Sequence, residues 1–297
     1  NAHIDVLGYK HIAELVNDRF YANQVRSIEY AELSKFFTRN ADLSGQFSDY
    51  FESFDLVITY LFDPDRIFEN NLRRCGVERI VVGPAKISAH THAARQLAQP
   101  LLQLGVTVND WRSHLYPSIE DREAARSFLA DLAKPIVAIH PGSGSESKNW
   151  PLENWIQLGN QLLALDSRSG GFPGADGGER RFGSRRSLFG SIVIVCGEAD
   201  ERQAQALESI WQAQPVRFAK NFPLPHLAAI LENTIFAGHD SGISHLAAAV
   251  GAKCTLLFGP SDPDIWAPNG DHVRVIRAPN GNLSELTVDS VSRALPL

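Results

Sequence analysis

The sequence predicts an α/β protein with two consecutive domains, each built around a parallel sheet. Short apolar runs that resemble strands alternate with longer segments of helical period, which is typical of parallel α/β units. This alternation is interrupted once and then resumes. A chain of 297 residues is long for one domain and short for three. We therefore expect two domains, residues 1–132 and 133–297.

Candidate strands follow one another in both halves of the chain. The expected strands are residues 4–8, 54–61 and 79–83 in the first half, and 136–140, 191–197, 234–238 and 254–259 in the second. Between the halves, residues 111–117 are typical of an irregular connection, and residues 119–133 predict a helix that leads into the second domain. The boundary is therefore expected between residues 105 and 135.

One segment of the second half differs in composition from its surroundings. Residues 167–187 contain six Gly and five Arg with almost no apolar periodicity, which predicts a loop inserted between a helix and the next strand. Two interpretations stay open: a disordered surface insertion, or a basic flap over an anionic ligand or a membrane surface.

The composition excludes several classes of protein. With 44% apolar and 21% charged residues, the chain is typical of a soluble globular protein. A net charge of -6 with interspersed acids and bases gives no basic stripe, so we expect no nucleic-acid partner. No apolar run approaches the roughly 18 residues of a membrane span, and we expect a cytoplasmic location. Cys75, Cys196 and Cys254 are widely spaced, which predicts buried free thiols.

The first motif is the loop at residues 140–151, with the sequence His-Pro-Gly-Ser-Gly-Ser-Glu-Ser-Lys-Asn-Trp-Pro. It follows a buried strand and precedes a helix that opens near Leu152. Small residues leave backbone N–H groups accessible, and Lys148 supplies a compact positive charge, so the loop suits a diphosphate. It matches neither the P-loop nor the dinucleotide-binding glycine fingerprint. A plain connecting turn with Lys148 as a solvated charge stays an alternative.

The second motif, residues 236–249, contains the end of a strand and the start of a helix. Asp240 or Ser241 can cap that helix, and the amides of Ser241, Gly242 and Ile243 then form a positive end suited to phosphate. His245 follows about one turn later. Because the carboxyl ends of parallel strands meet at one edge of a sheet, both loops should face one crevice. Asp240 as a plain cap and His245 as a buried core histidine stay open alternatives.

Two further strand ends contribute to the predicted site. In the segment 196–201, Cys-Gly-Glu-Ala-Asp-Glu, a carboxylate can accept hydrogen bonds from ribose hydroxyls, and Glu198 is the preferred candidate. Acids that only favour a first helical turn are the alternative. The proline-rich segment 258–268 predicts a rigid loop that walls the site.

These motifs together resemble glycosyltransferase family 9, the bacterial lipopolysaccharide heptosyltransferases and their relatives. The resemblance rests on Asp-Ser-Gly-Ile-Ser-His-Leu-Ala-Ala-Ala, on the later Leu-Phe-Gly-Pro-Ser-Asp-Pro and Trp-Ala-Pro, and on His-Pro-Gly-Ser with Lys148 and Trp150. It covers nearly the whole chain, weakly before Ala133. It implies a GT-B fold, in which two Rossmann-like domains face each other across a cleft.

The resemblance also implies ligands and residue roles. The donor would be a nucleotide sugar, ADP-linked and carrying a heptose or similar sugar, and the acceptor a lipopolysaccharide-core glycan or glycolipid. The enzyme would need no metal or other cofactor and would work at the cytoplasmic face of the inner membrane. Its donor-binding residues would be Ser143, Gly144, Lys148, Asp240, Ser241, Gly242 and His245, with Glu198 at the ribose.

The catalytic base is the point at which the sequence departs from the family. Family members invert the anomeric centre, and a carboxylate that follows their first strand deprotonates the acceptor hydroxyl. Residues 1–8 resemble the family's second strand, so the base is unknown here and is expected before Asn1. A noncatalytic nucleotide-sugar-binding relative therefore stays an alternative. An unrelated dehydrogenase or epimerase ranks below both, because the Gly-x-Gly-x-x-Gly and Tyr-x-x-x-Lys patterns are absent from the sequence.

Overall fold

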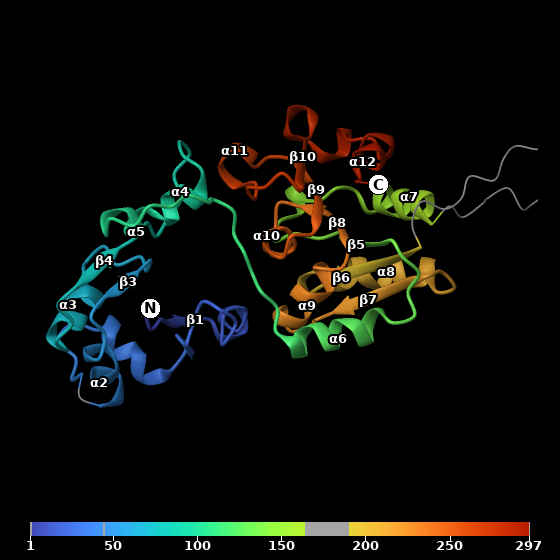
Figure 1. The fold of residues 1–297 in the computed structure, drawn as a ribbon. Coiled ribbons are helices and arrows are strands. Elements are labelled where there is room, and N and C mark those ends of the chain that lie inside the picture. Colours follow the sequence, from blue (N-terminus) through green and yellow to red (C-terminus); the bar gives the residue numbers. More distant parts are fainter. Residues whose placement is uncertain (1, 44, 164–189, 297) are drawn as a thin grey trace, which may run out of the picture. The chain divides into compact units, whose positions relative to one another are not determined.

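A computed structural model describes residues 2–43, 45–163 and 190–296 and contains two compact units (Figure 1). The first unit is Asn1–Trp111 with Asp264–Trp266, and the second is Arg112–Pro263 with Ala267–Leu297. The insertion at 167–187 lies outside the described residues, so both interpretations of it stay predictions.

The first unit contains two separate parallel sheets. Strands β1 (Asp5–Gly8) and β2 (Gln24–Ser27) form one sheet, and β3 (Val57–Thr59) and β4 (Ile80–Val82) form the other. The helices of this unit are α1 (Lys10–Ala13), η1 (Ala31–Phe37), α2 (Gln46–Glu52), α3 (Ile67–Arg74), α4 (Ala93–Leu97) and α5 (Gln99–Gln103).

Aromatic side chains form much of the core of the first unit. The rings of Phe36 and Phe51 lie 4.9 Å apart, and Phe68 of α3 packs beside both. Helix α3 begins where the Asp63 carboxylate accepts hydrogen bonds from the amides of Ile67 and Glu69, at 2.8 and 3.0 Å. Asp63 is therefore engaged in holding the first turn of α3.

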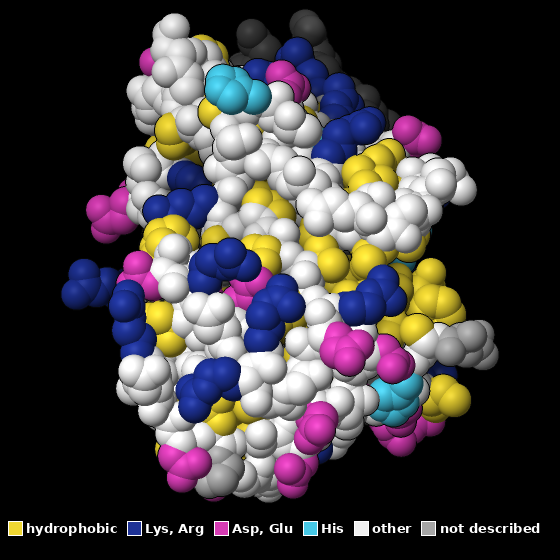
Figure 2. Space-filling model, turned by 90° about the vertical axis from the view of Figure 1, so that its left-hand side faces the viewer, with side chains coloured by type: hydrophobic (Ala, Val, Ile, Leu, Met, Phe, Trp, Pro, Cys, Tyr) yellow, Lys and Arg dark blue, Asp and Glu magenta, His cyan; other side chains and the backbone are white. Residues whose placement is uncertain are grey.

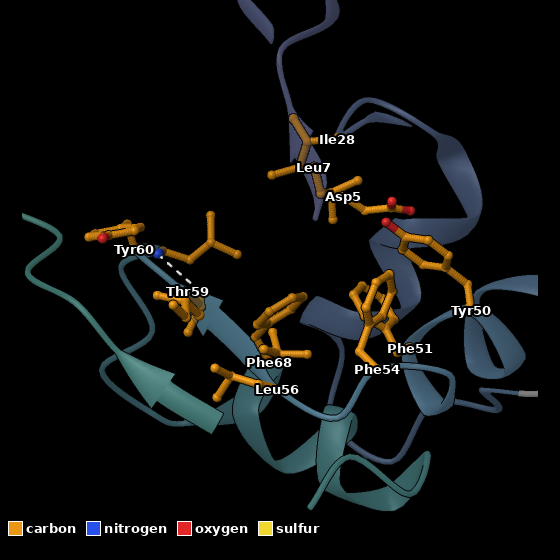
Figure 3. A pocket seen from close by; sticks show the side chains of 13 residues that line it. Asp5, Leu7, Ile28, Tyr50, Phe51, Phe54, Leu56, Thr59, Tyr60 and Phe68 are labelled. Carbon is orange, nitrogen blue, oxygen red and sulfur yellow. Dashed lines mark hydrogen bonds between the residues drawn. The ribbon is translucent and has the colours of Figure 1, made fainter. Parts of the chain in front are cut away.

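A cavity of about 290 Å³ lies between β1 and β3 (Figure 3). Leu7, Phe51, Phe54 and Phe68 give it a largely apolar lining. Among the described residues, β1 pairs only with β2, and β3 pairs only with β4. The other edge of β1 and the other edge of β3 are therefore unpaired. The cavity thus separates two half-sheets within one unit.

The second unit contains a single six-stranded parallel sheet. Its order is β10-β9-β8-β5-β6-β7, with β5 (Ile136–His140), β6 (Ser191–Cys196), β7 (Val216–Lys220), β8 (Ile235–His239), β9 (Lys253–Phe258) and β10 (Val273–Arg277). The α-helices are α6 (Ile119–Leu129), α7 (Leu152–Leu162), α8 (Glu201–Trp211), α9 (Leu224–Leu231), α10 (Gly242–Ala249) and α12 (Val288–Ala294). The short helix α11 (Pro263–Trp266) follows β9 in the chain, and its last three residues belong to the first unit. Short 3₁₀ turns are η2 (Glu146–Lys148), η3 (Glu198–Asp200), η4 (Pro279–Gly281) and η5 (Leu283–Glu285).

The central strands of this sheet are buried along their whole length. Every residue of β5 and β6 is buried, as expected for parallel strands with both faces covered. Helix α12 packs against α7, and α6 packs against α9 (Figure 1). Trp155 and Leu158 place the apolar face of α7 in the core. The predicted α/β class is therefore confirmed.

The strand order places a topological switch at the pair β5–β8. From β5 the chain continues to β6 and β7 on one side, and then crosses to β8, β9 and β10 on the other. In open parallel sheets the crevice for a ligand forms at the carboxyl ends of the strands at such a point. The loops after β5 and β8 therefore occupy the position where a site is expected.

Each candidate strand of the sequence analysis is present, although β3 and β4 are shorter than expected. Strands β2, β7 and β10 were not expected. The two compact units divide between Trp111 and Arg112, within the expected range of 105–135 but before the predicted domain limit at residue 132. Helix α6 lies in the second unit because it packs against α9. The cysteines are free and buried, as predicted.

A substitution at Gly159 tests the packing of α7 against α8. Helix propensity alone favours Ala over Gly by about 1 kcal/mol. A Cβ at this position, however, would lie 2.4 Å from the ring of Trp211. We expect Gly159→Ala to destabilise the protein by about 1–3 kcal/mol in thermal unfolding. Gln157→Ala, on the exposed face of the same helix, is the control and should change little; a higher melting temperature for Gly159→Ala would contradict the packing.

Candidate functional site

The two predicted loops meet in space through an ion pair. Nζ of Lys148 lies 2.7 Å from Oδ2 of Asp240. The Lys148 side chain is 35% exposed and the Asp240 side chain 10% exposed, so the pair lies at the edge of the sheet with its cation accessible. Lys148 is therefore ion-paired and only partly exposed, unlike the solvated charge of the connecting-turn interpretation.

His239 anchors the loop that carries Lys148. The amide of Trp150 donates to Nε2 of His239 at 2.8 Å, and the indole N–H of Trp150 donates to the carbonyl of Leu286 at 3.0 Å. Burial lowers the pKa of His239 to about 3, so the ring is neutral. Because Nε2 accepts, the proton resides on Nδ1, which faces the carbonyl of Gly142 at 3.4 Å. Both ends of the loop are thus held by one buried ring.

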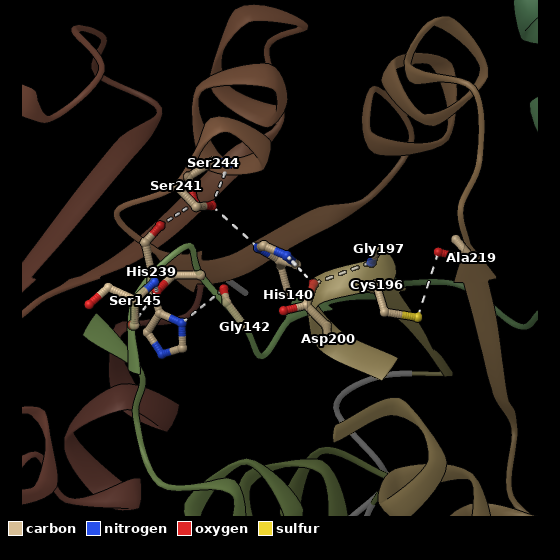
Figure 4. A network of polar contacts seen from close by, with 11 residues as sticks. His140, Gly142, Ser145, Cys196, Gly197, Asp200, Ala219, His239, Ser241 and Ser244 are labelled. Atoms are coloured by element: carbon tan, nitrogen blue, oxygen red, sulfur yellow. Dashed lines mark hydrogen bonds and ion pairs between the residues drawn. The ribbon is translucent and has the colours of Figure 1, made fainter. Parts of the chain in front are cut away.

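A chain of polar contacts connects the loops after β5, β6 and β8, and its His140 and Asp200 side chains are buried (Figure 4). Nε2 of His140 lies 3.2 Å from Oδ2 of Asp200, and Nδ1 lies 3.3 Å from the hydroxyl of Ser241. The amide of Gly197 donates to Asp200 at 3.2 Å. Burial raises the pKa of Asp200, but its contacts with His140 and Gly197 outweigh burial, so the net pKa is lowered. Asp200 is therefore a buried carboxylate held in its ionised form.

Ser241 is the N-cap of α10. Its hydroxyl accepts from the amide of Ser244, and its own carbonyl also accepts from that amide at 3.1 Å. The interpretation of Asp240 as a plain cap is therefore wrong. The amides of Gly242 and Ile243 occupy the first helical positions, where no carbonyl of the helix can accept from them. They are donors available to an anion at the positive end of the helix.

The remaining predicted residues lie at the same edge of the sheet, in less buried positions. Ser143 uses its hydroxyl locally, donating to the carbonyl of Ser145 at 2.8 Å, and Gly144 is exposed. His245 is also exposed, so its interpretation as a core histidine is wrong. Glu198 is exposed, in the same 3₁₀ turn as the buried Asp200. Their contacts with a ligand stay predictions.

His140 and His239 have no role in the sequence-based interpretation of these motifs, and Asp200 is there only one of three acids that could meet the ribose, with Glu198 preferred. The two histidines are the last residues of the buried strands β5 and β8. A polar residue that ends an otherwise apolar central strand needs a buried partner, and that pattern is visible in the sequence. Asp200 could not be separated from its neighbours Glu198 and Glu201 by residue type alone.

Within residues 2–43, 45–163 and 190–296, no three His, Cys, Asp or Glu side chains are grouped so that they could hold a metal ion. No helix in these segments combines the length and apolar character needed to cross a membrane. Figure 2 shows acidic, basic and apolar side chains interspersed on one face of the molecule.

Gly142 is required by the close approach of Asp200. A Cβ on Gly142 would lie 1.6 Å from Oδ1 of Asp200, whereas one on Gly144 would meet nothing within 4 Å. We expect Gly142→Ala to displace the Asp200 carboxylate from His140 and to cost about 1–3 kcal/mol of unfolding free energy. Gly144→Ala is the matched control and should unfold close to wild type. Equal melting temperatures for the two variants would contradict the contact.

Part of the chain matches a known protein family, and the chain is similar in sequence to named proteins. Residues 186–294 match the family described as "Glycosyltransferase family 9 (heptosyltransferase)". The chain is 28% identical over 191 residues to lipopolysaccharide heptosyltransferase 2 of Salmonella typhimurium, and the match covers 64% of this chain and 47% of that protein. The chain thus spans about half the length of the curated relatives it matches.

Two solved structures share the fold. A family 9 glycosyl transferase from Veillonella parvula superposes with a TM-score of 0.72 at 17% identity, covering 98% of this chain and 86% of that one. An Escherichia coli heptosyltransferase solved with ADP gives a TM-score of 0.64 at 18% identity, covering 98% and 88%. The α/β fold is that of the GT-B heptosyltransferase structures. The chain is therefore similar in sequence and fold to the lipopolysaccharide heptosyltransferases, and its residues 186–294 match the glycosyltransferase family 9 model.

Proposed function

We propose that the chain takes part in the inverting transfer of a heptose-like sugar from an ADP-linked donor to a lipopolysaccharide-core or related glycan acceptor. The donor binds in the second unit, between the loops after β5 and β8. The observation that carries this proposal is the contact of Lys148 with Asp240 at the switch point of the sheet. A related heptosyltransferase was solved with ADP, which supports the choice of nucleotide.

The charges of the site suit a diphosphate leaving group. As the glycosidic bond to the donor phosphate breaks, negative charge develops on the nucleoside diphosphate. Lys148 and the amides of Gly242 and Ile243 are fixed donors that stabilise such charge without a metal ion. Metal-independent transfer follows as part of the proposal.

Asp240 has a different role from Lys148. A carboxylate repels phosphate oxygens, so it does not bind the diphosphate directly. Its oxygens hold the Lys148 ammonium in place at 2.7 Å and can accept hydrogen bonds from hydroxyl groups of the donor sugar. We assign Asp240 to the end of the site where sugar and diphosphate join.

For the acceptor, the proposal names the class of molecule but no binding residues. The base that deprotonates the acceptor hydroxyl is assigned to no described residue. Asp5, which lines the cavity of the first unit, is the first residue of β1 and so lies at the amino end of the strand, away from the edge where ligands bind. An acceptor that is part of a glycolipid would place the enzyme at the cytoplasmic face of the inner membrane.

Lys148→Ala tests the nucleotide site. The variant loses the cation of the loop after β5, so we expect ADP to bind about tenfold or more weakly, equivalent to at least about 1.4 kcal/mol, in isothermal calorimetry. The matched control is Lys253→Ala, an exposed lysine at the amino end of β9 and so at the opposite edge of the sheet. Wild-type ADP affinity in Lys148→Ala would contradict the assignment of Lys148 to the nucleotide site.

Asp240→Asn separates the two roles of the carboxylate. The amide keeps the shape of the side chain but lacks the charge that holds Lys148. We expect ADP affinity to fall less than in Lys148→Ala, and affinity for ADP-heptose to fall more than affinity for ADP. Equal losses for the two ligands would show that Asp240 acts only through Lys148.

A separate assay tests the alternative that the protein only binds nucleotide sugars. Turnover of ADP-heptose with a lipopolysaccharide-core acceptor would exclude that alternative.

A further inference from the structure

The contact chain formed by Asp200, His140 and Ser241 joins three loops of the candidate site. His140 ends β5, Asp200 lies in η3 after β6, and Ser241 caps α10 after β8. The side chains of His140 and Asp200 are 6% and 7% exposed. Buried polar groups need partners within the protein, so the chain is a built feature of the fold.

The chemistry of these groups sets the direction of each hydrogen bond. An ionised Asp200 only accepts, so Nε2 of His140 donates to it across 3.2 Å. In the neutral form of the imidazole, Nδ1 then carries a lone pair, and the hydroxyl of Ser241 donates to it across 3.3 Å. The oxygen of Ser241 keeps its lone pairs for the amide of Ser244.

This arrangement bears on the helix end that faces the site. Ser244 also donates its hydroxyl to the carbonyl of His239, so the first turn of α10 is tied back to the end of β8. Asp240, which holds Lys148, is the residue immediately before the cap. Any change in the rotamer of Ser241 therefore affects both the helix amides and the ion pair.

We infer that His140 is a positioning residue for the nucleotide site. Its imidazole accepts a hydrogen bond from the hydroxyl of Ser241. This contact orients the serine oxygen toward the amide of Ser244 and so fixes the first turn of α10. Asp200 holds the imidazole in the tautomer that does this. The inference rests on the proposed nucleotide-binding function of the same site.

The order of contacts, carboxylate to imidazole to hydroxyl, is that of a hydrolase triad. A nucleophilic role does not follow, because the Ser241 oxygen is engaged in capping α10. The contacts support alignment of the helix end, with no bond formed to Ser241.

A double-mutant cycle tests the inference with ADP as the probe. His140→Phe keeps the ring volume and loses both nitrogens, and Ser241→Ala loses the hydroxyl. We expect each change to weaken ADP binding about tenfold, and the double variant to bind about as weakly as either single one, because the same contact is already lost. Additive losses, or wild-type affinity in either single variant, would overturn the inference.

Two further variants separate positioning from general stability. Ser241→Thr keeps the hydroxyl and should bind ADP close to wild type. Thr287→Ala removes the N-cap of α12, where Thr287 accepts from the amide of Ser290, and should lower the melting temperature without changing ADP affinity. An ADP affinity that falls in Thr287→Ala as far as in Ser241→Ala would reduce the role of Ser241 to stability alone.

Two measurements that need no nucleotide test the positioning role separately from the proposed function. Nitrogen-15 NMR of the wild-type protein should show His140 with its proton on Nε2, and amide exchange at Ser244 should be faster in His140→Phe than in wild type. If wild type fails to bind ADP, the proposed function fails while these measurements still decide the positioning role. A proton on Nδ1, or unchanged exchange at Ser244, would overturn it.

Discussion

The pairing of β5 with β8 is the constraint on which the site depends. The chain leaves β5 toward one side of the sheet and returns through β8 on the other, so two loops far apart in sequence begin side by side. Lys148 and Asp240, on these loops, then lie close enough for an ion pair. The charges of the site are therefore a consequence of strand order, since neither loop contains the pair by itself.

Buried polar groups convert this proximity into a fixed geometry. His239 holds both ends of the loop after β5, while His140 connects the loops after β6 and β8 through Asp200 and Ser241. Both imidazoles are hydrogen-bonded to groups of the protein. Lys148 and the start of α10 lie nearer the surface than the buried groups that support them.

The sequence predicted the buried parts of the fold better than its edges. The runs that form β5, β6, β8 and β9 are mostly apolar, because both faces of these strands are largely covered. Strands β7 and β10 form the two edges of the sheet and β2 the edge of a smaller one, and each contains Arg or Lys. Edge strands bury less surface, so their apolar signal is weak. Likewise, the loops of the site were predictable from small residues at strand ends, whereas the partner of each histidine depends on contacts between distant segments.

The ion pair also has a consequence for ligand selectivity. An unliganded cavity that presented a bare ammonium group would attract any small anion, including the abundant phosphate of a cell. Here Lys148 already has a carboxylate neighbour, so an incoming anion must compete with Asp240 for the same charge. A single phosphate gains little from that exchange, because the local charge is balanced before it arrives. If the donor binds as proposed, an extended molecule that also engages the amides of α10 gains more from that exchange than a single phosphate does.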